Sequence, residues 1–215
     1  MKTYNAKDTI NHVTYLLETK QKFAFVTYTR SAIMSVLNEI GDEKKPPKSF
    51  TKSVLDGLQK KDKSFIKAIQ NDLAYSALPK LEKVGVKLDH VYDPGFLESY
   101  INTNIDIFKT FMNWYVRNTK SIIVSFQAES HISRHFSHDS KLINVPYNDF
   151  YSRIDSIVAS VKEHESDAYL CVLDCPMLGA ALAPRIWDAT NLSVLDLGRT
   201  LNVVKNVARQ NDIKK

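Results

Sequence analysis

Residues 22–41 read KFAFVTYTRSAIMSVLNEIG, and this stretch decides the fold class. Its first part, through Tyr28, is a short apolar run that is typical of a buried strand. From Ser31 to Ile40, apolar side chains recur at three- and four-residue intervals, which predicts a helix, and Gly41 is expected just past its end. The polar break Thr29-Arg30-Ser31 separates the two halves. The stretch therefore predicts one strand–turn–helix unit.

The rest of the chain alternates in the same way. Further strands are predicted at 86–92, 121–126, 141–145, 168–173 and 192–197, and helical patterns at 6–19, 50–84, 96–118, 128–137, 148–164, 176–189 and 200–210. Strands that are continuously apolar and separated by helices indicate a mostly parallel sheet with helices on both faces. We predict an α/β, Rossmann-like fold with residues 1–215 as a single domain. The helical insertion 50–84 is a candidate cap, and the loop 42–49 precedes it.

Composition narrows the class of partner. The formal net charge is +5 and the pI is about 9.0, which favours polyanions such as nucleic acid or a phosphorylated ligand. Lysine runs at 44–45 and 60–63 are also typical of plain solvated surface, so charge alone does not decide. No apolar run reaches the ~20 residues that cross a bilayer, and the N-terminus has no apolar signal core. We expect a cytoplasmic protein without membrane contact, in which Cys171 and Cys175 are buried thiols.

Several motifs are missing from the sequence. It has no GxGxxG, no GxxxxGK[ST] and no GxSxG, so a standard dinucleotide enzyme, a P-loop ATPase and a nucleophile-elbow hydrolase are not supported. His131, His135 and His138 have a spacing that could bind a metal on one helical face, but their serine-rich context and the nearby Arg134 favour a basic loop that is either solvated or phosphate-facing. The aromatic run at 108–115 is expected to be core and not a base-stacking platform.

Polar residues gather where the predicted strands end. In open parallel sheets, ligands bind beyond the carboxyl ends of the strands. The candidates there are Thr29, Arg30, Ser31, Tyr92, Asp93, Gln127, Glu129, Ser130, His131, Arg134, His135, Asn144, Pro146, Tyr147, Asn148, Asp174, Cys175, Pro176, Asp196, Gly198, Arg199 and Thr200.

Four stretches carry a resemblance to a known family. They are FAFVTYTRSAIMSVL, INVPYNDFYSRID, LCVLDCPMLGAALAPRIWDAT and LSVLDLGRT. Together they resemble the GT-D class of glycosyltransferases over most of residues 22–205. That class has an Arg/Phe-Gly-Asp-Gly-Glu turn between its first strand and helix, a later strand ending in a small residue and proline, and another ending in Asp-Ile-Gly-His. The late pair here is Asp174-Cys175-Pro176 and Asp196-Leu197-Gly198-Arg199.

The chain departs from that pattern at the first turn. The family's Asp-x-Glu, which helps to hold a divalent metal on the donor diphosphate, falls on Arg30-Ser31-Ala32, and the closing histidine falls on Arg199. An arginine can neutralise a diphosphate directly and bidentately. The resemblance therefore implies a metal-independent diphosphate site, or a fold that has lost catalysis. It implies a nucleotide sugar as co-substrate and no other cofactor, and a divalent metal is not favoured.

The resemblance also implies roles for residues at the strand ends. A leaving diphosphate must be stabilised and an acceptor hydroxyl deprotonated. The base is expected among Asp93, Asp174 and Asp196, although Asp174 can instead cap a helix and Asp196 can orient a turn. The diphosphate is expected at Arg30, Ser31, His131, Arg134 and Arg199. The nucleoside and sugar are expected at Gln127, Asn144, Tyr147, Cys175 and Pro176.

The acceptor rests on the resemblance and on charge. Phage enzymes that glycosylate hydroxymethylated cytosine are small transferases of this general kind, so the expected function is glucosyl or arabinosyl transfer from a UDP-type donor to 5-hydroxymethylcytosine in DNA, in the host cytoplasm. Two alternatives stay open. One is a transferase that acts on protein or an envelope glycan, and the other is a non-catalytic nucleic-acid-binding or regulatory module. The donor sugar, the stereochemical outcome and the oligomeric state are not predicted.

Overall fold

A six-stranded parallel sheet forms the centre of the molecule. The computed structural model describes residues 1–39, 45–127, 129 and 135–204. The strand order is β3-β2-β8-β7-β5-β6, and every neighbouring pair is parallel. The strands are β2 (Ala24–Thr27), β3 (Phe65–Ala68), β5 (Ser121–Ser125), β6 (Lys141–Asn144), β7 (Leu170–Asp174) and β8 (Ser193–Asp196). The predicted Rossmann-like α/β class is confirmed.

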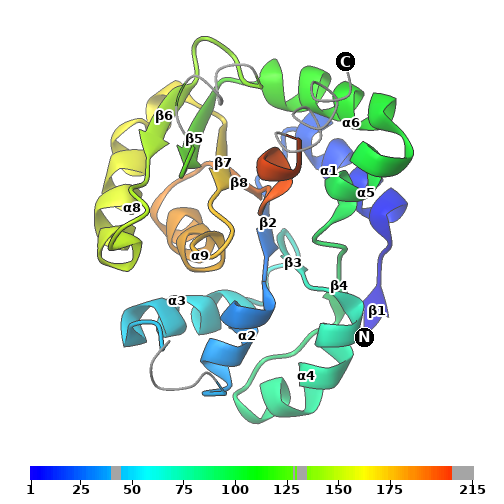
Figure 1. Cartoon of the computed structure of the whole chain (residues 1–215), viewed down its shortest axis with the longest axis vertical. Helices are drawn as coiled ribbons and strands as arrows, with labels where there is room; N and C mark the ends of the chain where they lie inside the picture. Colours follow the sequence, from blue (N-terminus) through cyan, green and yellow to red (C-terminus); the bar gives the residue numbers. More distant parts are fainter. Residues whose placement is uncertain (40–44, 128, 130–134, 205–215) are drawn as a thin grey trace, which may run out of the picture.

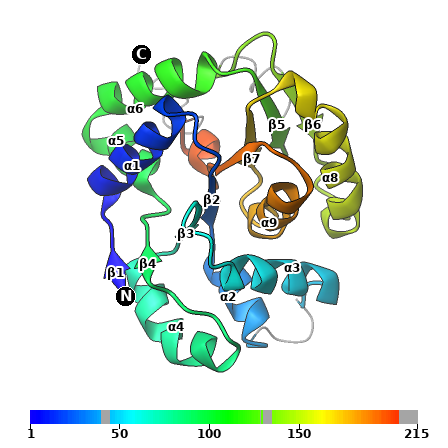
Figure 2. The same cartoon turned by 180° about the vertical axis from the view of Figure 1, so that it is seen from behind.

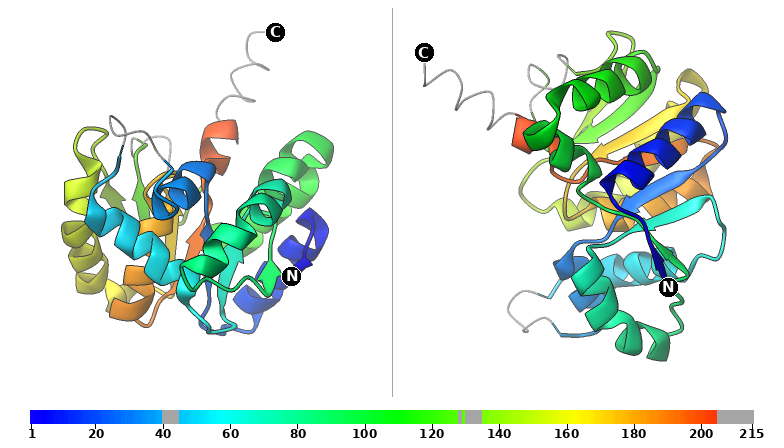
Figure 3. Two further views of the ribbon diagram at one scale, coloured as in Figure 1. Left: turned by 90° about the horizontal axis from the view of Figure 1, so that it is seen from below. Right: turned by 90° about the vertical axis from the view of Figure 1, so that its right-hand side faces the viewer.

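Helices cover both faces of this sheet (Figures 1 and 3). One buried cluster joins the sheet to α2 (Arg30–Val36), α3 (Lys48–Gln59), α4 (Asn71–Lys83), α8 (Ile154–Glu163) and α9 (Gly179–Ala189). A second cluster joins the other face to α1 (Ala6–Glu18), α5 (Phe96–Thr103), α6 (Ile105–Phe111), the π-helix η2 (Met112–Arg117) and the helical residues 200–204. Figure 2 shows the same arrangement from behind. Short 3₁₀ turns η3 (Phe150–Arg153) and η4 (Glu165–Asp167) flank α8.

The predicted helical insertion contains a strand of the main sheet. Within 50–84, residues Phe65–Ala68 form β3, which pairs with β2 along its whole length, so the prediction of helix there is wrong. The strand is only four residues long and includes Lys67, so its sequence does not form a continuous apolar run. The Lys67 Nζ donates a hydrogen bond to the Lys60 carbonyl at 2.8 Å, so the side chain reaches the surface of this edge strand while its stem packs.

The strand predicted at 86–92 is mostly absent. Only β4 (His90–Val91) is extended, and it pairs with β1 (Lys2–Thr3) in a separate two-stranded sheet. Tyr92 adds a single bridge to Ala68 at the end of β3. The apolar side chains of this segment, such as Val86 and Val91, are buried by packing and not by a central place in the sheet.

Two helices end differently from the prediction. Helix α2 ends at Val36, and Asn38 takes the left-handed conformation with φ 57° that was expected of Gly41, which lies outside the described residues. The helix predicted over 96–118 breaks at Asn104, between α5 and α6. Trp114, predicted as core, is 70% exposed, because η2 turns it away from the buried side chains. The helix predicted at 128–137 falls largely outside the described residues.

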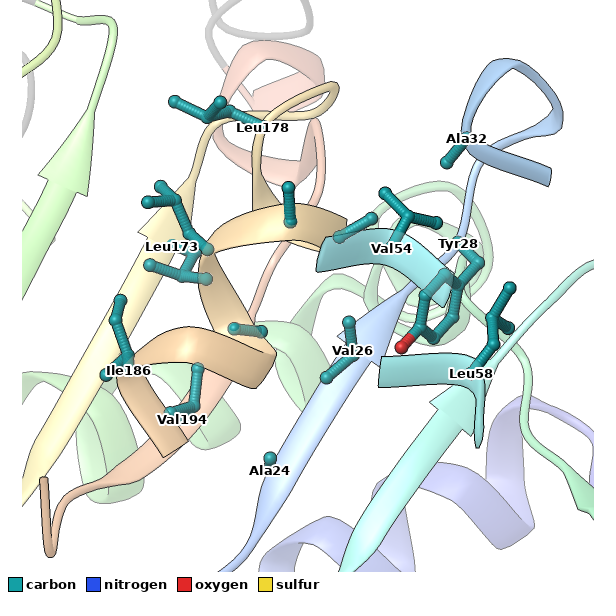
Figure 4. Close-up of a cluster of buried hydrophobic side chains, with 14 of the residues drawn as sticks. Ala24, Val26, Tyr28, Ala32, Val54, Leu58, Leu173, Leu178, Ile186 and Val194 are labelled. Atoms are coloured by element: carbon teal, nitrogen blue, oxygen red, sulfur yellow. The ribbon is translucent and has the colours of Figure 1, made fainter. Parts of the chain in front are cut away.

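Helix α9 packs closely against α3 because small residues face the contact. Gly57 of α3 faces the Tyr28 hydroxyl and Pro184 of α9, and a Cβ at Gly57 would lie 2.5 Å from the Tyr28 hydroxyl oxygen. Tyr28 lies between Val54 and Leu58 of α3 in the buried cluster (Figure 4). Its hydroxyl has no hydrogen-bond partner in the described structure, and burial, with Asp196 nearby, raises its pKa.

Substitution of Gly57 tests this contact. We expect Gly57→Ala to lower the free energy of unfolding by about 1–3 kcal/mol through overpacking, although alanine is the better helix former. Tyr28→Phe removes the clashing and unpartnered hydroxyl and should be neutral or stabilising. In the double variant the cost of Gly57→Ala should shrink, as urea unfolding would show. Asp56→Ala, at an exposed position on α3, is the control. Costs that simply add would contradict this packing.

Candidate active site at the carboxyl edge of the sheet

A polar cavity of about 240 Å³ lies beyond the carboxyl ends of the strands. Its walls come from segments far apart in sequence, which the parallel sheet brings to one edge. They are Thr27, Tyr28, Thr29 and Arg30 after β2, Gln70 after β3, Pro94, Gly95 and Glu98 around the start of α5, Pro176 after β7, and Gly198 and Arg199 after β8. We call this the polar cavity.

Two arginines line the polar cavity from opposite loops. Arg30 is the first residue of α2, is exposed, and has no ion-pair or hydrogen-bond partner among the described side chains. Thr29 fixes the start of the helix, because its side chain accepts a hydrogen bond from the Ala32 N–H. Arg199 is 70% exposed, and its Nε donates to the Glu98 carboxylate at 3.4 Å. Two cations at one cavity suit an anionic ligand.

The Asp196 carboxylate ties together the two loops that carry these arginines. One oxygen accepts the Thr27 N–H and the other accepts the Gly198 N–H, each at 3.0 Å. Asp196 is 2% exposed, and burial raises its pKa to about 7. The approach of α9 leaves no room beside it, since a Cβ at Gly179 would lie 2.6 Å from a carboxylate oxygen. Asp196 therefore positions the arginines from beneath the cavity.

Asp174 is a second buried carboxylate, at the end of β7. It accepts hydrogen bonds from the Ser125 hydroxyl at 2.7 Å and the Gln127 amide at 2.8 Å. Burial raises its pKa to about 6, although both hydrogen bonds favour the charged form. Asp174 Oδ1 and Gln127 Oε1 have no partner in the described part of the chain.

The predicted base candidates lie around the polar cavity and do not line it. Asp174 and Asp196 are buried, and Asp93 accepts the Gly95 N–H at 2.8 Å within the turn before α5. In the described walls of the cavity, Glu98 is the carboxylate that is present. Sequence reasoning missed Glu98, and it missed Gln70 because the strand before it was taken for helix.

Other predicted ligand residues are dispersed. Pro176 lines the polar cavity and Ser31 lines its neighbour. Cys175 is fully buried, its thiol donates to the Val124 carbonyl, and burial raises its pKa. The Asn144 amide donates to the Gln127 carbonyl, and Tyr147 is 71% exposed and stacked on Phe126. His131 and Arg134 lie outside the described residues. Their roles remain predictions.

A second cavity of about 590 Å³ adjoins the first. It shares Thr29 and Arg30 with the polar cavity and is otherwise mainly apolar. Its lining residues are Thr29, Arg30, Ser31, Met34, Glu39, Pro46, Phe50, Tyr151 and Met177. We call it the apolar cavity. No sequence signal indicated it, because Phe50, Tyr151 and Met177 come from three separate elements.

The turn between β2 and α2 carries no carboxylate that could bind a metal. Arg30, Ser31 and Ala32 offer no carboxylate. Within the described ranges, no group of three or more histidine, cysteine, aspartate or glutamate side chains is placed to hold a metal ion. A metal at this turn therefore does not fit the residues present. Across the same ranges, the helices also lack the length and apolar character needed to span a membrane.

Comparison with known proteins places the fold. No protein-family profile and no curated protein matches this chain. Two solved structures do match: one is described as a new glycosyltransferase (DUF1792) from Streptococcus sanguinis, with TM-score 0.75, and the other as a domain of unknown function 1792, with TM-score 0.73. Each is 12% identical and matches over 98% of this chain, and over 85% and 82% of the respective neighbour. At this identity the similarity shows a shared fold.

The buried carboxylates should leave a signature in the pH dependence of stability. Because burial raises the pKa of Asp196 to about 7 in the folded protein, the folded state binds more protons than the unfolded state between about pH 4 and 7. The contribution of Asp196 to the free energy of unfolding is therefore fully present below about pH 4 and is lost as the pH rises toward 7. The free energy of unfolding of wild type minus that of Asp196→Asn should fall over this range in urea titrations. Asp56→Asn is the control, and a flat difference for Asp196→Asn would refute the raised pKa.

Proposed function

We propose that this protein is a glycosyltransferase that moves a sugar from a nucleotide-diphosphate donor to a hydroxyl acceptor. The observation that carries the proposal is the pair Arg30 and Arg199 at the polar cavity, where a parallel α/β sheet binds ligands. The fold shared with a protein described as a glycosyltransferase supports it. UDP is the donor nucleotide that we would test first.

Sugar transfer requires that the polar cavity stabilise the leaving diphosphate and supply a base for the acceptor hydroxyl. A bond forms between the acceptor oxygen and the anomeric carbon, the bond from that carbon to the diphosphate oxygen breaks, and the hydroxyl proton passes to a base. Negative charge builds up on the leaving diphosphate, and fixed cations nearby stabilise it. Arg30 and Arg199 supply these cations, and Asp196 holds their loops before the substrate arrives. Pre-organisation of this kind lowers the barrier without rearrangement during the reaction.

Glu98 is our candidate for the base. It lines the cavity, and its side chain is 21% exposed, so an acceptor hydroxyl can approach it. Its single contact with the exposed Arg199 at 3.4 Å is weak and can yield when a diphosphate competes for the arginine. The predicted bases Asp93, Asp174 and Asp196 do not line the polar cavity, and each accepts at least one hydrogen bond, which favours structural roles for them.

The proposed transfer has no step through a metal, because the first turn lacks carboxylates. If the arginines neutralise the leaving group, transfer should continue in the presence of EDTA. Loss of transfer on chelation, restored by a divalent ion, would contradict this part of the proposal.

For the acceptor we retain 5-hydroxymethylcytosine in DNA, on the support of the +5 net charge. Mass spectrometry of products, after a panel of nucleotide sugars is offered with hydroxymethylated DNA, with peptide and with glycan, would identify the acceptor and separate this proposal from a protein- or glycan-directed transferase. Binding to duplex DNA should weaken as salt rises if phosphates are contacted. DNA binding without turnover of any donor would favour the non-catalytic alternative.

Replacing Arg30 tests the diphosphate site. We expect Arg30→Ala to weaken UDP binding by about 1.5–3 kcal/mol, which is the range for hydrogen bonds to charged groups. Calorimetric titration with UDP would measure this loss. Arg117→Ala removes an exposed arginine of η2 that does not line the polar cavity, and it should bind UDP as the wild type does. Equal UDP affinity of wild type and Arg30→Ala would remove the central residue of the proposal.

Replacing Glu98 separates catalysis from binding. Glu98→Gln keeps the shape of the side chain and removes the base, so we expect kcat to fall by about 10²–10⁴-fold. UDP binding should be equal or tighter, because Arg199 loses a competing carboxylate. Steady-state kinetics beside UDP titration would show both effects. Retention of kcat in Glu98→Gln would exclude Glu98 as the base.

A further inference from the structure

We propose that the apolar cavity binds the acceptor, and that the acceptor carries its hydroxyl on a planar ring. This inference rests on the proposed function. It assigns the donor diphosphate and sugar to the polar cavity and the ring of the acceptor to its neighbour. Arg30 and Thr29 line both cavities, so the two ligands would meet at the turn between β2 and α2.

The chemistry of the wall favours a ring. At about 590 Å³ the apolar cavity is within the range of small-molecule sites. Its apolar lining is formed by Met34, Pro46, Phe50, Tyr151 and Met177. Tyr151 is held by neighbouring rings, with Phe50 at 5.0 Å and Phe150 at 4.2 Å between centroids. Met177 is 43% exposed at this wall, and a ligand would cover that apolar surface.

The polar groups of the cavity are mostly engaged already. Glu39 pairs with Lys80, and Thr29 bonds the Ala32 N–H and the Ser31 hydroxyl. The cavity therefore offers few free groups to a polyol, which needs many hydrogen bonds. Arg30 has no partner in the described structure, and a guanidinium stacks well on a planar ring.

The sharing of Arg30 argues for an acceptor over a second part of the donor. Arg199, the other cation, lines the polar cavity but not the apolar cavity. A diphosphate held by both arginines therefore sits in the polar cavity, where Gln70 is available to a hydroxyl of the donor sugar and Glu98 remains the candidate base. The apolar cavity on the other side of Arg30 then remains for the acceptor.

Binding of small alcohols tests the assignment without relying on turnover. We would titrate the protein with benzyl alcohol and with 5-hydroxymethyl-2′-deoxycytidine, which carry a hydroxymethyl group on a carbocyclic ring and on a nucleobase, and with glycerol as a polyol. Ligand-observed NMR would give the affinities. At least one ring alcohol should bind more tightly than glycerol, and UDP should not displace it. Which ring binds better identifies the source of the acceptor.

Two variants locate the site. Met177→Ser changes an exposed residue and should fold normally, while Tyr151→Ala removes the ring wall. Each should weaken ring-alcohol binding by about tenfold, the size expected for loss of a central contact. UDP affinity should not change. Tyr75→Ser, at an exposed aromatic residue of α4 that lines neither cavity, is the matched control.

Three results would overturn the inference. They are displacement of the ring alcohol by UDP, which would place the nucleobase of the donor in the apolar cavity; affinities that Met177→Ser leaves unchanged; and a preference for glycerol. Failure of the proposed function looks different. In that case UDP would not bind and no sugar would be transferred, whatever the ring alcohols do.

Discussion

The carboxylate of Asp196 holds the functional edge of this molecule together. It joins β2 to β8 by accepting the Thr27 N–H, across 169 residues of sequence, and it fixes the turn after β8 through the Gly198 N–H. Connections from these two strands leave toward opposite faces of the sheet, α2 on one side and residues 200–204 on the other. The loops diverge there and leave the space that becomes the polar cavity. A buried carboxylate with both oxygens bonded to backbone is a rigid way to fix that divergence.

Glycines make this arrangement sterically possible. Gly179 lets the start of α9 rest against the Asp196 carboxylate, and Gly198 takes the φ of 58° that turns the chain back toward Asp196. Larger side chains at Gly179 would push the helix away from β8. A missing side chain likewise allows the close contact of Gly57 with Tyr28 and Pro184. The site is therefore specified as much by missing side chains as by the charged ones that line it.

Sequence patterns predicted the fold better than the site. Apolar runs such as Ser121–Ser125 and Leu170–Asp174 identified buried strands, because both faces of a parallel sheet are covered. Edge strand β3 was missed, since four residues with Lys67 among them do not form an apolar run, and the error hid Gln70. The strand-end rule located Arg30 and Arg199. It could not find Glu98, because Glu98 lies within helix α5 and not at the end of a strand. It could not find the apolar cavity either, because the walls of that cavity meet only through tertiary packing.

The strand order has a consequence for the assembly of the protein during synthesis. Strand β3 follows β2 closely in the sequence, but the other neighbour of β2 is β8, the last of the six strands to be made. Until then one edge of the apolar strand β2 stays unpaired. Such non-local pairing slows folding and leaves edges open to wrong partners. The sheet therefore stays incomplete until β8, the last of its six strands in chain order, has been made.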